Sequence, residues 1–299
     1  MILALLGTLA LLQPPHGATG YVPHRVFDTR HKSFTDFESM LADVARADVI
    51  FVGEQHDNPN THRLELAVVD GLMRRRVSLV IALEMFERDV QPVLDKYAAG
   101  TITEEEFLKG SRPWPRYATD YRPLIEFARE HHLPIVAANV PRPIAANVSK
   151  AGLSALDALG PQRGFAAREL QCAASGQYYD RFVAEMTGHA PAADPKTAPP
   201  ADVRTGTDRF FLAQCVKDET MAESVAAAFA NTSVERATIV YVNGAFHTDY
   251  GQGAAERTRR RLPGRRVAIL SMLPVDDIDG VVPGEEDLAR AEYLVYTVR

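Results

Sequence analysis

The stretch of residues 48–59 places the strongest constraint on how this chain can fold. Residues Val49–Val52 are apolar and mostly β-branched, which is typical of a strand buried on both faces. Gly53 ends this apolar run, and the ionisable residues Glu54 and His56 follow it immediately. The stretch therefore predicts a buried strand that delivers a carboxylate and an imidazole at its carboxyl end.

The chain is expected to turn directly into a helix after this motif. Asn58 and Pro59 have the pattern of a helix N-cap followed by proline at the first helical position. In open α/β sheets, ligands bind outside the carboxyl ends of the strands. A binding edge is one interpretation of this stretch, and an ordinary loop with polar residues facing water is the other.

A second stretch repeats the same pattern and favours the binding edge. Residues 237–244 form another apolar, β-branched run that ends in Gly244. His247 follows Gly244 by three residues, as His56 follows Gly53. The chain therefore carries two Gly-x-x-His units, each at the end of a predicted strand.

Two further apolar runs also contain polar residues near their carboxyl ends. Residues 79–86 include Glu84, and residues 134–142 include Asn139 and Arg142. Helical patterns separate all these runs, which predicts βαβ units. We therefore expect an α/β fold with a mostly parallel sheet flanked by helices.

The domain organisation follows from the same alternation. We expect one α/β domain over residues 21–299, with helical insertions after the second and third core strands at about 87–131 and 144–207. Residues 188–207 are rich in Pro, Ala and Thr and lack periodicity, which predicts a mobile loop. The next helix carries Asp218 in its apolar stripe, where the carboxylate either faces a functional cavity or lies at the rim.

Composition and the N-terminal segment bear on location and partners. The net charge of −6 argues against a nucleic-acid surface. Residues 2–12 are apolar and have the length of a signal-peptide core, so residues 1–20 are predicted to be a signal peptide and the protein to be exported. No cysteine stands near the end of this run, so a lipid anchor is not supported. Cys172 and Cys215 could form one disulfide or remain buried thiols, and the sequence leaves both open.

The strand ends predict one cluster of ionisable residues. In a single parallel sheet, Glu54, His56, Glu84, Asn139 and His247 would gather along one edge. Imidazole and carboxylate groups suit a divalent metal such as Zn, Mn or Fe, with His56, Glu84 and His247 as ligands. The same groups could instead act without metal as a general acid and base. Both kinds of chemistry stay open at this point.

Several motifs taken together resemble the ChaN group of haem-binding, iron-regulated proteins. This group lies within a superfamily that also includes the Tiki proteases, TraB-like proteins and erythromycin esterases. The resemblance covers about residues 35–272 and depends on the ordered set of motifs at residues 53–59, 82–86, 137–142, 214–222 and 244–247.

The resemblance implies which residues form the shared site. It carries over to Gly53, His56, Glu84, Gly244 and His247, with Glu54 inside the first motif. The superfamily's enzymes use these positions for metal-dependent peptide cleavage or metal-free ester hydrolysis. Residues expected to contribute to cofactor binding are Gly53, Asn139, Arg142, Asp218, Gly244, Tyr178 and Tyr179.

The resemblance also implies a bacterial protein of iron or haem uptake that binds haem, with a homodimer that holds haem between its protomers and a membrane-associated transport partner. The shared motifs do not identify the haem-iron ligand, for which the candidates are Tyr117, Tyr121, Tyr178, Tyr179 and His189. The competing hypothesis is a peptidase or esterase that uses His56, Glu84 and His247.

Overall fold

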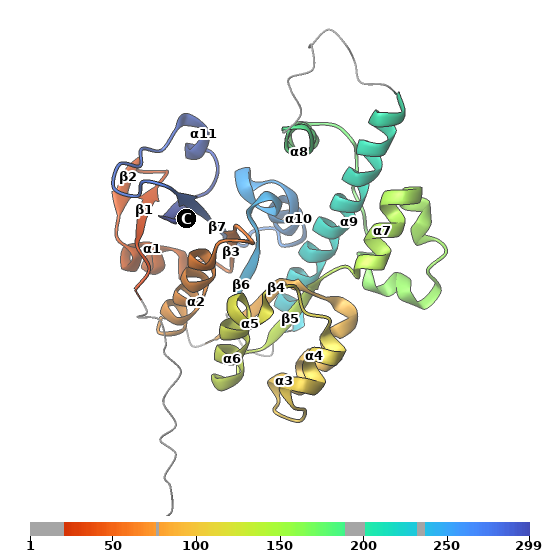
Figure 1. Cartoon of the computed structure of the whole chain (residues 1–299), viewed down its shortest axis with the longest axis horizontal. Coiled ribbons are helices and arrows are strands. Elements are labelled where there is room, and N and C mark those ends of the chain that lie inside the picture. The colour runs from red at the N-terminus through yellow and green to blue at the C-terminus, as the bar shows by residue number, and fades with distance from the viewer. Residues whose placement is uncertain (1–20, 76–77, 189–200, 232–236) are drawn as a thin grey trace, which may run out of the picture.

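The computed structural model describes residues 21–75, 78–188, 201–231 and 237–299 (Figure 1). The predicted signal peptide, residues 189–200 of the predicted loop and the candidate ligand His189 lie outside these ranges. None of the helices in the described ranges combines the length and apolar character needed to cross a bilayer.

The core is an eight-stranded mixed sheet with the strand order β2-β1-β8-β7-β3-β6-β4-β5. The strands from β8 to β5 in this order run parallel, and β1 pairs antiparallel with both β8 and β2. The predicted α/β fold with a mostly parallel sheet is confirmed. The strands are β1 (His24–Asp28), β2 (Ser33–Thr35), β3 (Val49–Glu54), β4 (Leu79–Glu87), β5 (Ile135–Asn139), β6 (Thr238–Gly244), β7 (Val267–Val275) and β8 (Tyr293–Val298).

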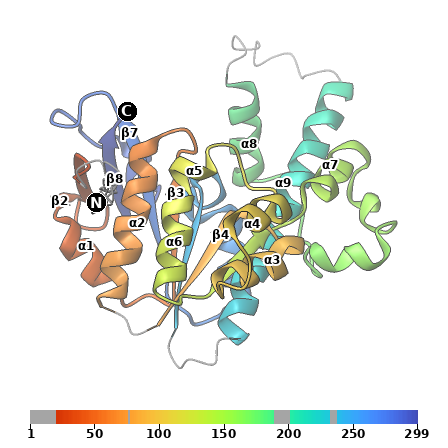
Figure 2. The ribbon, with the colours of Figure 1, turned by 60° about the horizontal axis from the view of Figure 1, so that its bottom comes forward.

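Helices cover both faces of this sheet, and each strand contributes apolar side chains to both faces because successive side chains point to opposite sides. Ile50 and Val52 of β3 pack in the core beneath α1 to α6, whereas Val49 and Phe51 pack in the core beneath α9 and α10 (Figure 2). The helices are α1 (Phe37–Val44), α2 (Pro59–Met73), α3 (Gln91–Ala98), α4 (Glu104–Ser111), α5 (Tyr117–Asp120), α6 (Arg122–Glu130), α7 (Arg142–Ala151), α8 (Gln177–Thr187), α9 (Ala201–Asn231), α10 (Gly253–Arg261) and α11 (Glu285–Leu288). Short 3₁₀ helices are η1 (Arg88–Val90), η2 (Leu153–Leu156), η3 (Gly160–Phe165), η4 (Ala245–His247) and η5 (Asp249–Gly251).

The second helical region differs from its sequence pattern at two places. Helix α9 begins at Ala201, so residues 201–207 are helical and not part of a loop. The sequence did not predict this extension because it contains three weak helix formers, Thr205, Gly206 and Thr207. Residues 166–176 form an irregular segment between η3 and α8, so Cys172 does not lie in a helix.

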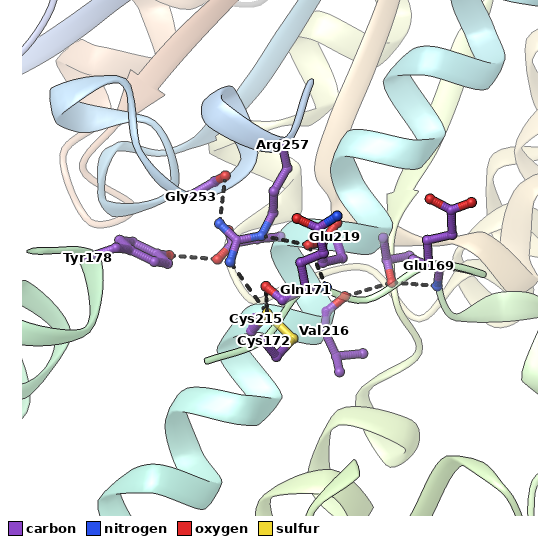
Figure 3. The surroundings of a disulfide bond; sticks show 12 residues. Glu169, Gln171, Cys172, Tyr178, Cys215, Val216, Glu219, Gly253 and Arg257 are labelled. Atoms are coloured by element: carbon purple, nitrogen blue, oxygen red, sulfur yellow. Dashed lines mark hydrogen bonds and ion pairs between the residues drawn. A yellow bond between two sulfur atoms is a disulfide. The ribbon is translucent and has the colours of Figure 1, made fainter. Parts of the chain in front are cut away.

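A disulfide joins Cys172 of this irregular segment to Cys215 of α9 (Figure 3). Arg257 of α10 donates a hydrogen bond to the Cys215 sulfur at 3.3 Å, and its Nε lies 3.3 Å from Glu219. Glu219 is fully buried and also accepts from the backbone N–H of Gln171 at 3.0 Å. The disulfide and this ion-pair network tie the segment that leads into α8 to both α9 and α10.

Candidate functional site

The strand register brings the two Gly-x-x-His units together. Glu54 of β3 lies beside Gly244 of β6 in the parallel ladder. The ladder of β4 with β5 slips between Leu83 and Glu87, and Glu84 lies within this slip. Glu84 Oε2 accepts a hydrogen bond from the Gly244 N–H at 2.8 Å. The carboxyl ends of β3, β6 and β4 therefore meet at one point.

The His56 ring occupies the space beside the Cα of Gly244, and the Glu84 carboxylate lies at contact distance. A Cβ at this position would lie 2.7 Å from His56 Nε2 and 3.6 Å from Glu84 Oε2. His247 Nε2 lies 3.3 Å from Glu84 Oε1. The structure thus gathers His56, Glu84 and His247 around Gly244, as the strand ends predict, while their chemical role stays a prediction.

His247 lies between two buried carboxylates. Its Nδ1 is 2.6 Å from Asp218 Oδ1, and its Nε2 faces Glu84. Burial alone would lower the pKa of His247, but the charges of Glu84 and Asp218 outweigh it and raise this pKa to about 9. Burial alone would raise the pKa of Glu84, but the charge and hydrogen bond of His247 outweigh it and lower this pKa to about 2. His247 and Glu84 therefore form a buried ion pair.

Asp218 is held from its other side by Tyr178, whose hydroxyl donates to Asp218 Oδ2 at 2.6 Å. Asp218 is fully buried, so its carboxylate faces the cluster and not the rim. Gln214, one helical turn earlier in α9, places its side-chain nitrogen 3.1 Å from His247 Nδ1. Helix α9 thus places Asp218, which accepts the hydrogen bond of the His247 ring, and Gln214 beside it.

His56 is the exposed member of the cluster. Its side chain is 45% exposed, and its Nδ1 hydrogen bonds to Oε1 of the buried Glu54. Burial lowers the pKa of His56, but the Glu54 hydrogen bond and the charge of Glu84 raise it above its usual value. The ring also packs edge-on against Trp114, with 5.1 Å between ring centroids. His56 therefore faces solvent while a carboxylate fixes its orientation.

A cavity of about 300 Å³ opens beside His56 and Gly244. Charged side chains dominate its wall, which makes it suited to a small polar ligand. Residues lining it include Glu54, His56, Arg181, Phe246, Asp249, Tyr250 and Arg290.

Three other residues predicted to bind the cofactor, Asn139, Arg142 and Tyr179, have partners other than His56 and His247. Asn139 hydrogen bonds to the Glu84 carbonyl at 3.1 Å and to the Val140 N–H at 2.8 Å, so both ends of its amide support backbone. Arg142 lies outside the cluster, with its guanidinium carbon 5.6 Å from the centroid of the Trp114 ring. The Tyr179 hydroxyl hydrogen bonds to Asp208 at 2.5 Å.

Two residues of α2, His62 and Glu65, lie buried beneath Glu54. The sequence motifs did not predict that either residue belongs to the site. His62 Nδ1 is 3.0 Å from Glu54 Oε2 and 3.3 Å from Glu65 Oε2. A signal for both residues was available, because they share one helical face with the core residues Val69 and Leu72 at intervals of three, four and three residues.

Comparison with solved structures shows the fold. The solved structure "Cofacial heme binding to ChaN of Campylobacter jejuni" is similar to this chain, with a TM-score of 0.68 and 18% identity over 92% of this chain and 97% of that one. An erythromycin esterase has a TM-score of 0.48 and 14% identity over 92% of this chain and 83% of that one.

Comparison of sequences identifies the family. The chain is 24% identical over 241 residues to the chloroplastic Protein RETICULATA-RELATED 5 of Arabidopsis thaliana, which covers 76% of this chain but only 31% of that protein. The family model described as "Haem-binding uptake, Tiki superfamily, ChaN" matches residues 40–258, which is most of the chain. The chain therefore belongs to the ChaN family of haem-binding uptake proteins in the Tiki superfamily.

Proposed function

We propose that this chain binds haem in an open apolar groove across the N-terminal half of α9, and that it acts in haem or iron uptake. The observation that carries this proposal is a groove of about 340 Å³ lined by residues of α7, α8 and α9. Helices α7 and α8 lie on either side of α9 (Figure 1). The floor of the groove is one face of α9, formed by Phe210, Ala213, Gln214 and Lys217. The family to which the chain belongs and the haem bound to Campylobacter jejuni ChaN support the same ligand.

The groove exposes apolar side chains that a folded protein normally buries. Phe210 and Met186 are 52% and 55% exposed, and both line the groove. Contiguous exposed apolar surface of this kind marks ligand or partner sites. Phe182 and three alanines complete the apolar lining, which suits a flat macrocycle.

Polar groups of the groove suit the rest of a haem molecule. Arg142 and Lys217 line the groove and carry the positive charge that pairs with propionate groups. Met186 brings a thioether, which is a known axial ligand of haem iron. Tyr178 and Tyr179, in contrast, already donate their hydroxyls to Asp218 and Asp208. Bound haem would supply iron for transport or release. The apolar residues of the groove, together with Arg142 and Lys217, would hold and orient it.

An open groove leaves one face of a flat ligand uncovered, and a second copy of the chain could cover it. This geometry supports the proposed homodimer with haem between protomers. The Cys172–Cys215 disulfide supports export, because disulfides persist in oxidising compartments. Delivery of haem to a membrane-associated transport partner is part of the same proposal.

Titration of the purified chain with haem tests the proposal. We expect a shift of the Soret band that saturates at a defined stoichiometry, and light scattering should show a dimer in the haem-bound sample. Phe210→Glu removes apolar contact and places a negative charge in the groove, so haem affinity should fall roughly 10- to 100-fold, or about 1.5–3 kcal/mol.

Val282→Glu is the matched control, because Val282 is 83% exposed and does not line the groove. This variant should bind haem like the unmodified chain. An absent Soret shift, or equal haem affinity for Phe210→Glu and Val282→Glu, would contradict haem binding in this groove.

We propose hydrolysis of a small ester or peptide as the second candidate function. It is favoured by the convergence of His56, Glu84 and His247 beside the polar cavity. Glu54 orients the half-exposed His56, which can give or take a proton at the mouth of this cavity. A panel of peptides and esters, assayed with and without divalent metals, should then show turnover that His247→Gln abolishes. Absence of turnover with every metal would exclude this function for the panel.

A further inference from the structure

We propose that Glu54, His62 and Glu65 form a binding site for one divalent transition metal ion. This site lies beneath the cluster of His56, Glu84 and His247 around Gly244. This site differs from the predicted metal site at His56, Glu84 and His247. It also does not depend on haem binding, because none of its three ligands lines the apolar groove proposed to bind haem.

The spacing of the three side chains matches a set of metal ligands. One potential ligand atom from each residue lies within 4.8 Å of the other two. His62 Nδ1 is 3.0 Å from Glu54 Oε2 and 3.3 Å from Glu65 Oε2. Metal bonds of about 2.0–2.2 Å place neighbouring ligand atoms about 3–3.5 Å apart, so both His62 distances already fit a bound ion.

Two carboxylate oxygens of this cluster are buried and incompletely satisfied. Glu54 and Glu65 are each 1% exposed; Glu65 Oε1 has no hydrogen bond among the described residues, and Glu54 Oε2 has only the His62 Nδ1 contact at 3.0 Å, which lacks hydrogen-bond geometry. Buried carboxylate oxygens without partners are costly. A cation among these side chains would supply the missing interaction, and two carboxylates would balance its double charge.

The surroundings of His62 leave its Nδ1 suited to metal binding. His62 Nε2 lies 3.2 Å from the carbonyl oxygen of His56, to which it can donate its proton. Without a metal, Nδ1 donates its proton to the neighbouring carboxylates, and a bound ion would displace this proton and take the Nδ1 lone pair. Histidines that bind metals usually donate their other ring N–H to a carbonyl or carboxylate in this way.

The groups around Glu54 also fix its position. The Tyr121 hydroxyl donates to Glu54 Oε1 at 2.9 Å, and the same oxygen accepts from His56. The other oxygen, Oε2, is thereby directed toward His62. An ion bound here would lock β3 to the first turns of α2 and hold His56 through Glu54.

The ligand set favours one class of metal. One imidazole with two carboxylates suits Zn²⁺, Mn²⁺ or Fe²⁺, whereas Mg²⁺ and Ca²⁺ prefer oxygen ligands alone. His62 is 4% exposed, so the ion would be enclosed by protein. A structural role follows from this enclosure.

Equilibrium dialysis of the tag-free, chelator-treated full chain against Zn²⁺ or Mn²⁺ tests the proposal. We expect one equivalent of bound metal by elemental analysis and a rise in Tm. Glu65→Gln keeps the side-chain shape but weakens a ligand, so metal affinity should fall at least about 10-fold. Glu105→Gln, an exposed glutamate paired with Lys109, is the matched control and should keep the metal.

X-ray absorption of the Zn²⁺-loaded unmodified chain provides a second measurement that needs no variant. It should show one nitrogen and two or more oxygen ligands at about 2.0–2.2 Å. Failure of the unmodified chain to bind metal would overturn the proposal. Metal that is lost in His247→Gln but retained in Glu65→Gln would overturn it as well.

Discussion

Replacing both Cys172 and Cys215 by alanine is expected to lower the free energy of unfolding by about 4 kcal/mol. The disulfide closes a loop between residues 43 positions apart, and opening a loop of this length restores chain entropy of about that size to the unfolded state. Cys215 is fully buried next to Arg257, so the substitution also removes a hydrogen-bond acceptor. Urea denaturation under oxidising conditions measures the loss.

Reductant provides the matched control for this prediction. Reduction of the unmodified chain should lower its stability toward that of the double variant, whereas the double variant should not respond. Because the disulfide anchors the segment before α8, haem affinity should weaken in parallel. Thiols that react with an alkylating agent in the unreduced native protein would contradict the bond, and with it this support for export.

Replacing Glu84 by alanine is expected to cost about 3–5 kcal/mol of stability. The change leaves the buried imidazolium of His247 without one of its two carboxylates and leaves the Gly244 N–H without its acceptor. Glu84→Gln keeps the acceptor for Gly244 and lets His247 become neutral, so it should cost less than half as much. Urea denaturation of the three proteins at pH 6 measures both effects.

The pH dependence of this ion pair has a defined sign. The pKa of His247 is raised to about 9, so its contribution is complete below about pH 6.5 and is lost as the pH rises through 9. The pKa of Glu84 is lowered to about 2, so its contribution is present above about pH 4.5 and is lost as the pH falls through 2. The stability difference between the unmodified chain and Glu84→Gln should therefore be greatest between about pH 4.5 and 6.5.

NMR of the His247 ring checks the ion pair at the level of one group. The ring should titrate near pH 9 in the unmodified chain and at lower pH in Glu84→Gln. A stability difference that is equal at pH 6 and pH 9.5, or a His247 ring that titrates near its usual pKa of about 6.5, would contradict the ion pair.

Local patterns were sufficient to predict the sheet and the meeting of the Gly-x-x-His units. The apolar runs at β3 and β6 are continuous because both faces of these strands are buried, and each ends at a glycine. Carboxyl ends of neighbouring parallel strands lie at one edge, so His56 and His247 had to come near each other once the strands pair. The N-cap at Asn58 was also readable, and its side chain accepts from the N–H groups of Asn60 and Thr61.

Features that depend on long-range geometry were not predictable. Glu84 was expected near the other strand ends, but its hydrogen bond with the Gly244 N–H and the slip of the β4–β5 register between Leu83 and Glu87 are recorded by no local pattern. The pairing of Cys172 with Cys215 depends on an irregular segment that folds back onto α9. The apolar groove combines α7, α8 and α9, and its exposed Phe210 and Met186 resemble ordinary core residues in the sequence.

A crystal structure of the chain grown with haem tests the central claim most directly. If haem binds in the groove, porphyrin density should lie against Phe210 and Met186, with the propionates directed toward Arg142 and Lys217. Porphyrin bound over Gly244, with His56 on the iron and the groove empty, would contradict this claim.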